Sequence, residues 1–173
     1  MGFCLFDNVA IAARAAQREL GIGRIAIVDF DVHHGNGTQA IFWEDDSVLF
    51  VSLHQYPFYP GSGGPDEQRE TILNVPMNGG DGDAEFLRAF DERIAPAVTH
   101  FDPELVLVSA GFDAHADEEI YRKATRVTED GFRELSRRCA QLGPRVGAVL
   151  EGGYNLDTLP GLVDAALDGF TSR

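Results

Sequence analysis

Lysine is almost absent from this sequence, and basic residues as a whole are scarce. Lys123 is the only lysine, and 14 Lys and Arg residues face 28 Asp and Glu residues, which gives a formal net charge of −14. Direct binding of nucleic acid needs a basic face, so we expect no nucleic-acid partner. An acidic surface instead favours cationic ligands such as amines or basic peptides.

Cysteine and long apolar runs are equally sparse. Cys4 and Cys139 stand far apart and form no CxxC pair, which argues against a disulfide framework and against a structural zinc cluster. No apolar stretch is long enough to span a bilayer, and no signal peptide follows Met1. We therefore expect a cytoplasmic protein with no membrane partner, and the composition gives no prediction of oligomeric state.

Apolar runs alternate with helical patterns along the 173 residues, which is the length of one domain. The alternation predicts an α/β fold, with a mostly parallel sheet covered by helices on both faces. Pro96 should kink or break one of the helices. The predicted strands are 25–29, 47–54, 71–75, 105–110 and 146–150, and the predicted helices are 8–20, 37–43, 83–100, 128–141 and 157–170.

The stretch that follows the first predicted strand is dense in metal-ligating side chains. Asp31 and His33 are alternate residues, so an extended backbone would point both side chains the same way. A carboxylate and an imidazole that converge at a strand end make up two thirds of a typical catalytic metal site.

Other predicted strands also end at polar residues, namely His54, Asp113 and Tyr154. Ligands of parallel α/β sheets bind beyond the carboxyl ends of the strands. We therefore predict that Asp31, His33 and Asp113 hold one metal ion and leave a coordination position open for catalysis. Oxygen and nitrogen donors together suit zinc, iron or manganese.

Tyr154 follows two glycines that free it from the last predicted strand. Its hydroxyl could donate a hydrogen bond to the oxyanion formed when a metal-activated water attacks a carbonyl. Loss of one such donor typically costs about 10²–10³ in rate.

The loop 55–65 interleaves aromatic residues with proline and glycine. Such a loop is rigid and costly to expose. Its aromatic side chains either pack as loop core or line a ligand channel, and the composition favours neither alternative.

Six motifs in order resemble the zinc-dependent deacetylases, which comprise histone deacetylases, acetoin-utilisation proteins and acetylpolyamine amidohydrolases. They span nearly the whole chain, and the loop after His54 is most similar to the class II histone deacetylases and their bacterial relatives. The resemblance implies the three-layer α-β-α arginase/deacetylase fold. The motifs are Gly2-Phe3-Cys4, Asp29 to Thr38, Ser52-Leu53-His54, Phe58 to Gly61, Ala110 to His115 and Glu151-Gly152-Gly153-Tyr154.

The resemblance implies a mechanism in which zinc on Asp31, His33 and Asp113 activates water while Tyr154 polarises the acetyl carbonyl. The substrate would be an acetylated lysine or a related acetylated amine. Its channel would be lined by Gly2, Phe3, Tyr59, Gly152 and Gly153.

The resemblance also implies structural monovalent cations, K⁺ in the family. One site would use Asp29, Asp31, Ser52 and the carbonyls of His33 and Leu53. A second, looser site would use carbonyls around Phe42, Asp45 and Val48. His34 and Asn36 would not bind the metal themselves but would lie next to the residues that do.

The chain departs from the family at its start. The family takes its general base from two adjacent histidines upstream of the segment that matches Gly2-Phe3-Cys4, and Asp29 and Asn36 match the residues that hold this pair. We therefore expect residues 1–173 to be the C-terminal portion of a single histone-deacetylase-like domain, incomplete at its N-terminus and with an exposed sheet edge. Proton transfer without the pair would lose about 10²–10⁴ in rate. The loop 116–120 also lacks the family's usual proline, which bears on substrate choice.

Two other functions remain open at this point. Asp113-Ala114-His115-Ala116-Asp117 has the D-x-H-x-D pattern of arginase-type ureohydrolases, which use two manganese ions. The remaining motifs favour the deacetylase. The missing histidine pair favours a second alternative, a domain that binds metal or acyl-lysine without turnover.

Overall fold

A computed structural model describes residues 3–118 and 124–172 of the chain. Five strands and the helices between them follow one another in the order that the sequence predicts, and a long loop without a helix joins the second strand to the third. The strands are β1 (Ile25–Asp29), β2 (Val48–Gln55), β3 (Ile72–Met77), β4 (Leu105–Ala110) and β5 (Val146–Leu150). The helices are α1 (Asn8–Leu20), α2 (Asn36–Phe42), α3 (Asp83–Ala89), the π-helical turn η1 (Phe90–Ile94), α4 (Ala95–Phe101), α5 (Glu129–Gln141) and α6 (Leu159–Thr171).

The strands form one sheet in the order β3-β2-β1-β4-β5, and every pairing is parallel. Strand β1 lies at the centre, where Asp29 pairs with Ser52 of β2 and with Ser109 of β4. Because all five strands run the same way, their carboxyl ends meet at one edge of the sheet. The predicted parallel sheet is confirmed.

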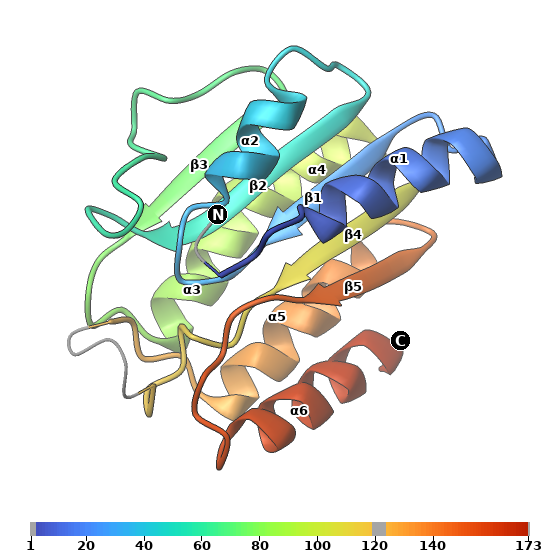
Figure 1. Cartoon of the computed structure of the whole chain (residues 1–173). Helices are drawn as coiled ribbons and strands as arrows, with labels where there is room; N and C mark the ends of the chain where they lie inside the picture. Colours follow the sequence, from blue (N-terminus) through green and yellow to red (C-terminus); the bar gives the residue numbers. More distant parts are fainter. Residues whose placement is uncertain (1–2, 119–123, 173) are drawn as a thin grey trace.

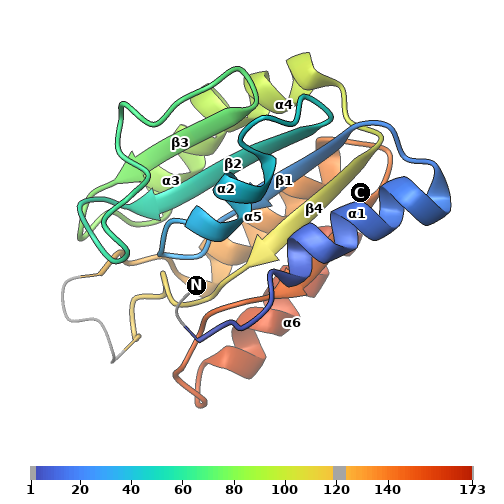
Figure 2. The same cartoon turned by 45° about the horizontal axis from the view of Figure 1, so that its top comes forward.

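Helices cover both faces of the sheet (Figures 1 and 2). On one face, Ile25 and Ile27 of β1 pack with apolar residues of α1 and α2. On the other face, Ala26 and Val28 pack with residues of α3, η1, α4, α5 and α6. Successive residues of a strand point to opposite faces, so each strand of this sheet contributes to both apolar cores. The predicted three-layer α-β-α architecture is therefore confirmed.

Helix α1 has the termini that its sequence predicts. The Asp7 carboxylate accepts a hydrogen bond from the Ala10 amide at 2.9 Å and so caps the first turn. Gly21 ends the helix in the left-handed conformation, with φ of 67°. Helix α1 contacts strands β4 and β5 (Figure 1).

The single helix predicted over residues 83–100 is interrupted. The π-helical turn Phe90–Ile94 separates α3 from α4, and Pro96 lies in the first turn of α4. Proline has no amide hydrogen to donate to the carbonyl four residues earlier, here Glu92, so the backbone widens just before it. The predicted break at Pro96 is confirmed.

Strands β3 and β5 form the edges of the sheet. Strand β1 is buried throughout, whereas Ala148 and Leu150 of β5 are exposed, Leu150 to 58%. The exposed sheet edge that the sequence predicts is present at β5. Phe3, Leu5 and Phe6 of the N-terminal segment are exposed as well. Within the described ranges, none of the helices has the length and apolar character needed to cross a bilayer.

Candidate active site

The loop after β1 brings Asp31 and His33 together by bending. Strand β1 ends at Asp29, and residues 31–33 are bends, so the extended backbone that the sequence predicts here is wrong. The juxtaposition itself is correct. The Asp31 carboxylate accepts from the His33 amide at 2.8 Å, and its Oδ1 lies 2.9 Å from His33 Nδ1.

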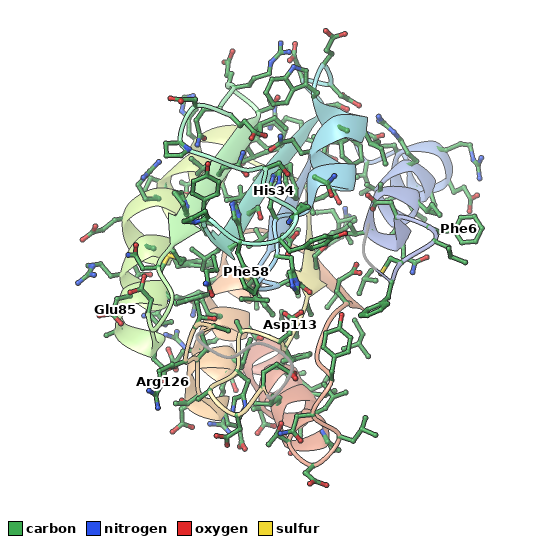
Figure 3. The ribbon with its side chains drawn as sticks, turned by 60° about the vertical axis from the view of Figure 1, so that its left-hand side comes forward. Phe6, His34, Phe58, Glu85, Asp113 and Arg126 are labelled. Atoms are coloured by element: carbon green, nitrogen blue, oxygen red, sulfur yellow. The ribbon has the colours of Figure 1, made fainter. Side chains whose placement is uncertain are left out.

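Asp113 completes this cluster from the loop that follows β4. Its Oδ1 accepts from the Val32 amide at 3.0 Å, and its Oδ2 lies 3.2 Å from His33 Nδ1. One ligand atom each from Asp31, His33 and Asp113 lies within 4.8 Å of the other two. Figure 3 shows Asp113 near the middle of the molecule, with Phe58 close by.

Two glycines leave room for these carboxylates. A Cβ atom at Gly111 would overlap the Asp31 carboxylate, and one at Gly152 would overlap the carboxylates of both Asp113 and Asp31. The Gly152 amide also donates to Asp31 Oδ2 at 3.0 Å. Glycine at both positions therefore permits the close approach of the two acidic side chains.

The cluster concentrates negative charge in a buried place. Burial alone would lower the pKa of His33, but hydrogen bonds with Asp113 and Asp31 raise it to about 10. Burial, followed by the charge of Asp31, raises the pKa of Asp113 to about 6 and that of Asp29 well above its usual range. A cation at this point would relieve the repulsion between the carboxylates.

The donor set fits a metal ion. Asp113 Oδ2 is buried and lies 3.2 Å from His33 Nδ1, so these two atoms can serve, with the Asp31 carboxylate, as ligands of one ion. Two carboxylates and one imidazole match the oxygen and nitrogen donors of catalytic zinc sites. The geometry is that of three side chains converging on a common point beyond the sheet.

The aromatic loop 55–65 both packs against the core and faces the cluster. Phe58 joins one of the apolar cores, and its ring stacks on His33 with centroids 5.4 Å apart and planes inclined by 18°. Tyr59, which the sequence predicts as a channel wall, is 54% exposed and meets the His33 ring edge-on at 5.9 Å. From the sequence, Phe58 receives no role in the site, although it belongs both to the aromatic run and to the motif from Phe58 to Gly61.

Tyr154 lies on the loop between β5 and α6. Gly153 has a φ of +125°, which side-chain-bearing residues rarely adopt, and it turns the chain toward Tyr154. The Tyr154 amide donates to Glu118 Oε2 at 2.8 Å. The Tyr154 ring meets Phe3 edge-on, with centroids 5.6 Å apart. The predicted channel residue Gly2 lies outside the described residues.

His34 and His54 are engaged away from the cluster. The two ring nitrogens of His34 bond to Ser62 and Gln39, each at 2.8 Å, and those of His54 bond to Ser52 and to the Gly63 carbonyl. His54 therefore links the aromatic loop to β2, and His34 links it to α2.

Asn36 begins helix α2 shortly after His34. Its Oδ1 is buried and has no hydrogen-bond partner within residues 3–118 and 124–172. An unpaired buried oxygen is uncommon in a folded protein, so Asn36 offers an acceptor at this point.

The residues predicted for the two monovalent sites lie in two separate places. Asp29 and Ser52 are buried partners on adjacent strands, next to Leu53. The turn that leads into β2 contains the others: the Phe42 carbonyl accepts from the Asp45 amide at 3.1 Å, and the Asp45 carbonyl accepts from the Val48 amide at 3.3 Å. Occupation of either place by K⁺ stays a prediction.

The D-x-H-x-D pattern does not assemble a second ligand cluster among the described residues, where Asp31, His33 and Asp113 form the one group with metal-binding geometry. His115 Nδ1 accepts instead from the Asp117 amide at 3.2 Å. Asp117 itself is exposed.

Comparisons with known proteins agree with one another. A profile of the family described as "Histone deacetylase domain" matches residues 1–170. The chain is 46% identical over 169 residues to "Histone deacetylase 10, chloroplastic" of Oryza sativa subsp. japonica, covering 92% of this chain and 38% of that protein. It is 41% identical over 184 residues to a "Probable deacetylase" of Archaeoglobus fulgidus, covering 98% of this chain and 50% of that protein.

Solved structures give the same picture. The crystal structure of the HDA15 HD domain superposes with a TM-score of 0.91 at 39% identity, covering 98% of this chain and 50% of that chain. An acetylpolyamine aminohydrolase from Burkholderia pseudomallei gives a TM-score of 0.89 at 35% identity, covering 99% of this chain and 51% of that chain. The present chain thus spans between 38% and 51% of the length of the relatives named in these comparisons.

Proposed function

This chain belongs to the histone deacetylase family and has its arginase/deacetylase fold, and we propose that its site hydrolyses the acetyl amide of acetyl-lysine or a related acetylated amine. The observation that carries the proposal is the convergence of Asp31, His33 and Asp113, with ligand atoms within 4.8 Å of one another beyond the carboxyl ends of the sheet. We also propose that residues 1–173 are the C-terminal portion of a single such domain.

Asp31, His33 and Asp113 would hold a zinc ion. The burial of Asp113 Oδ2 beside His33 Nδ1 and the glycines that make room for the carboxylates support this assignment. When bound, zinc supplies Lewis acidity that polarises the acetyl carbonyl and lowers the pKa of a water molecule to about 7. We further propose that K⁺ lies near Asp29 and Ser52, where burial of an acidic side chain calls for a counter-charge.

The residues around the cluster would orient the substrate. Phe58 fixes one face of the His33 ring, so that the Nδ1 edge stays directed at the carboxylates. Phe3 packs edge-on against the Tyr154 ring and, with Tyr59, would flank an aliphatic lysine side chain. The Tyr154 hydroxyl would donate a hydrogen bond to the acetyl oxygen as negative charge develops there.

The surface charge favours the same substrate class. A formal charge of −14 attracts amines and basic peptides, in which acetylated lysines occur. The cytoplasmic compartment stays a prediction, since relatives from rice and Arabidopsis thaliana carry the word "chloroplastic" in their names.

A second candidate function is binding without turnover. His34 and His54 use both ring nitrogens in hydrogen bonds, so neither is placed to take a proton from water, and Asn36 Oδ1 has no partner among the described residues. Hydrolysis by the chain alone would then proceed about 10²–10⁴ more slowly than with a general base.

One experiment separates these functions. The zinc-loaded chain is titrated calorimetrically with an acetyl-lysine peptide, and acetate release is followed in the same samples. Binding with slow release that Tyr154→Phe abolishes would support the deacetylase. Binding without release would support the second candidate, and absence of binding would contradict both.

A further inference from the structure

The loop that carries Tyr154 is held by hydrogen bonds to a buried carboxylate. Glu118 is only 8% exposed, and its Oε2 accepts from the Tyr154 amide at 2.8 Å and from the Asn155 amide at 3.3 Å. We infer that Glu118 is a positioning residue, which holds the backbone from which the side chain of Tyr154 extends. This inference rests on the role of Tyr154 in the proposed function.

The contact joins the two halves of the site. Glu118 lies on the same loop as the proposed ligand Asp113, while Tyr154 follows β5. The Phe112 amide donates to the Gly152 carbonyl at 2.8 Å, and the Asn155 side-chain amide donates to the Asp117 carbonyl at 2.8 Å. Hydrogen bonds therefore join the two loops on both sides of Tyr154, and Glu118 accepts the hydrogen bond from the Tyr154 amide itself.

The backbone next to Tyr154 is flexible unless hydrogen bonds restrain it. Gly152 and Gly153 precede it, and glycine leaves the chain free to adopt many conformations. A carboxylate accepting two amide hydrogens is a strong, directional restraint. Removing the Glu118 carboxylate should therefore free the backbone at Tyr154. The contacts of Gly152 with the carboxylates of Asp31 and Asp113 should remain.

The elements on either side have supports of their own. Helix α6 starts with hydrogen bonds from the Thr158 and Leu159 amides to the Asn155 carbonyl, and β5 pairs along its length with β4. Loss of the Glu118 carboxylate should thus act locally.

Hydrogen exchange directly tests the hydrogen bonds from the Tyr154 and Asn155 amides to Glu118. In the full zinc-loaded chain, Glu118→Ala should speed exchange of the Tyr154 and Asn155 amides about 10-fold, since it removes their acceptor. Glu118→Gln keeps an acceptor oxygen and should restore most of the protection. Asp117→Ala removes one negative charge from the same loop at an exposed position and serves as the control. Unchanged exchange in Glu118→Ala would overturn the inference.

A double-mutant cycle tests whether Glu118 acts through Tyr154. Glu118→Ala and Tyr154→Phe should each weaken binding of an acetyl-lysine peptide about 5-fold, and the double variant should be no weaker than Tyr154→Phe. Zinc content should stay the same throughout.

The possible results separate this inference from the proposed function. An equal loss from Glu118→Ala in both backgrounds would show a general structural effect and overturn the positioning role alone. Wild-type affinity in Tyr154→Phe would instead overturn the proposed role of the tyrosine, and the positioning role with it.

Discussion

The ring of Phe58 lies nearly parallel to the imidazole of His33, with centroids 5.4 Å apart. The stack closes one face of the imidazole and leaves its Nδ1 edge directed at two carboxylates, Asp31 and Asp113. A residue from the aromatic loop thereby sets the orientation of a proposed metal ligand.

Replacing Phe58 should therefore weaken metal binding. Because such ring pairs contribute about 1 kcal/mol, Phe58→Ala should raise the Kd for zinc about 5-fold. Competition with a chromophoric chelator measures this change. Phe6→Ala is the matched control, since Phe6 is exposed and points away from the site (Figure 3). Equal affinities for the two variants would contradict the role of the stack.

Gly152 should tolerate no side chain. The Cβ of Gly152→Ala would overlap Asp113 and push the carboxylates apart. We expect zinc affinity to fall about 10–100-fold, as it does when groups that orient metal ligands are changed. Gly37→Ala, inside α2 with only an ordinary contact at 3.5 Å, should bind zinc like the wild type. Unchanged affinity in Gly152→Ala would show that the glycine is not needed for this geometry.

His54 should make stability depend on pH. Burial, followed by the charge of His34, lowers the pKa of His54 from 6.5 to about 4. The unfolded chain then binds more protons than the folded one between these values, so the free energy of unfolding falls as pH drops from 6.5 to 4. The expected loss is about 3 kcal/mol.

Urea unfolding at several pH values, with chelator present, measures this loss. His54→Gln should lose less stability over the same pH range. The control is His100→Gln, because His100 is exposed near the end of α4 and should leave the curve unchanged. A wild-type slope in His54→Gln would contradict the assignment.

The fold could be predicted because its signals are local. Buried β-branched runs such as Ile25 to Asp29 give strands, Asp7 and Gly21 mark the ends of α1, and Pro96 marks the break before α4. Each of these follows from the chemistry of a few adjacent residues. The parallel topology then follows from the alternation of strands with helices.

The site could be predicted only in part. Asp31, His33 and Asp113 stand out because each follows a strand, although Asp31 and His33 meet through a bend and not through an extended backbone. The roles of Phe58 and Glu118 could not be predicted in this way, although Phe58 begins one of the family motifs. Their partners, His33 and Tyr154, are distant in sequence, and only folding brings them into contact.

The zinc content of purified chains tests the central claim most directly. After loading and removal of excess metal, the wild type and Tyr154→Phe should each retain one zinc ion per chain, while Asp31→Ala and Asp113→Ala should retain none. Atomic emission measures the metal, and circular dichroism verifies that the variants are folded. Zinc retained at wild-type levels in Asp31→Ala would contradict the account. Two manganese ions per chain in wild type that was purified without zinc loading would contradict it as well.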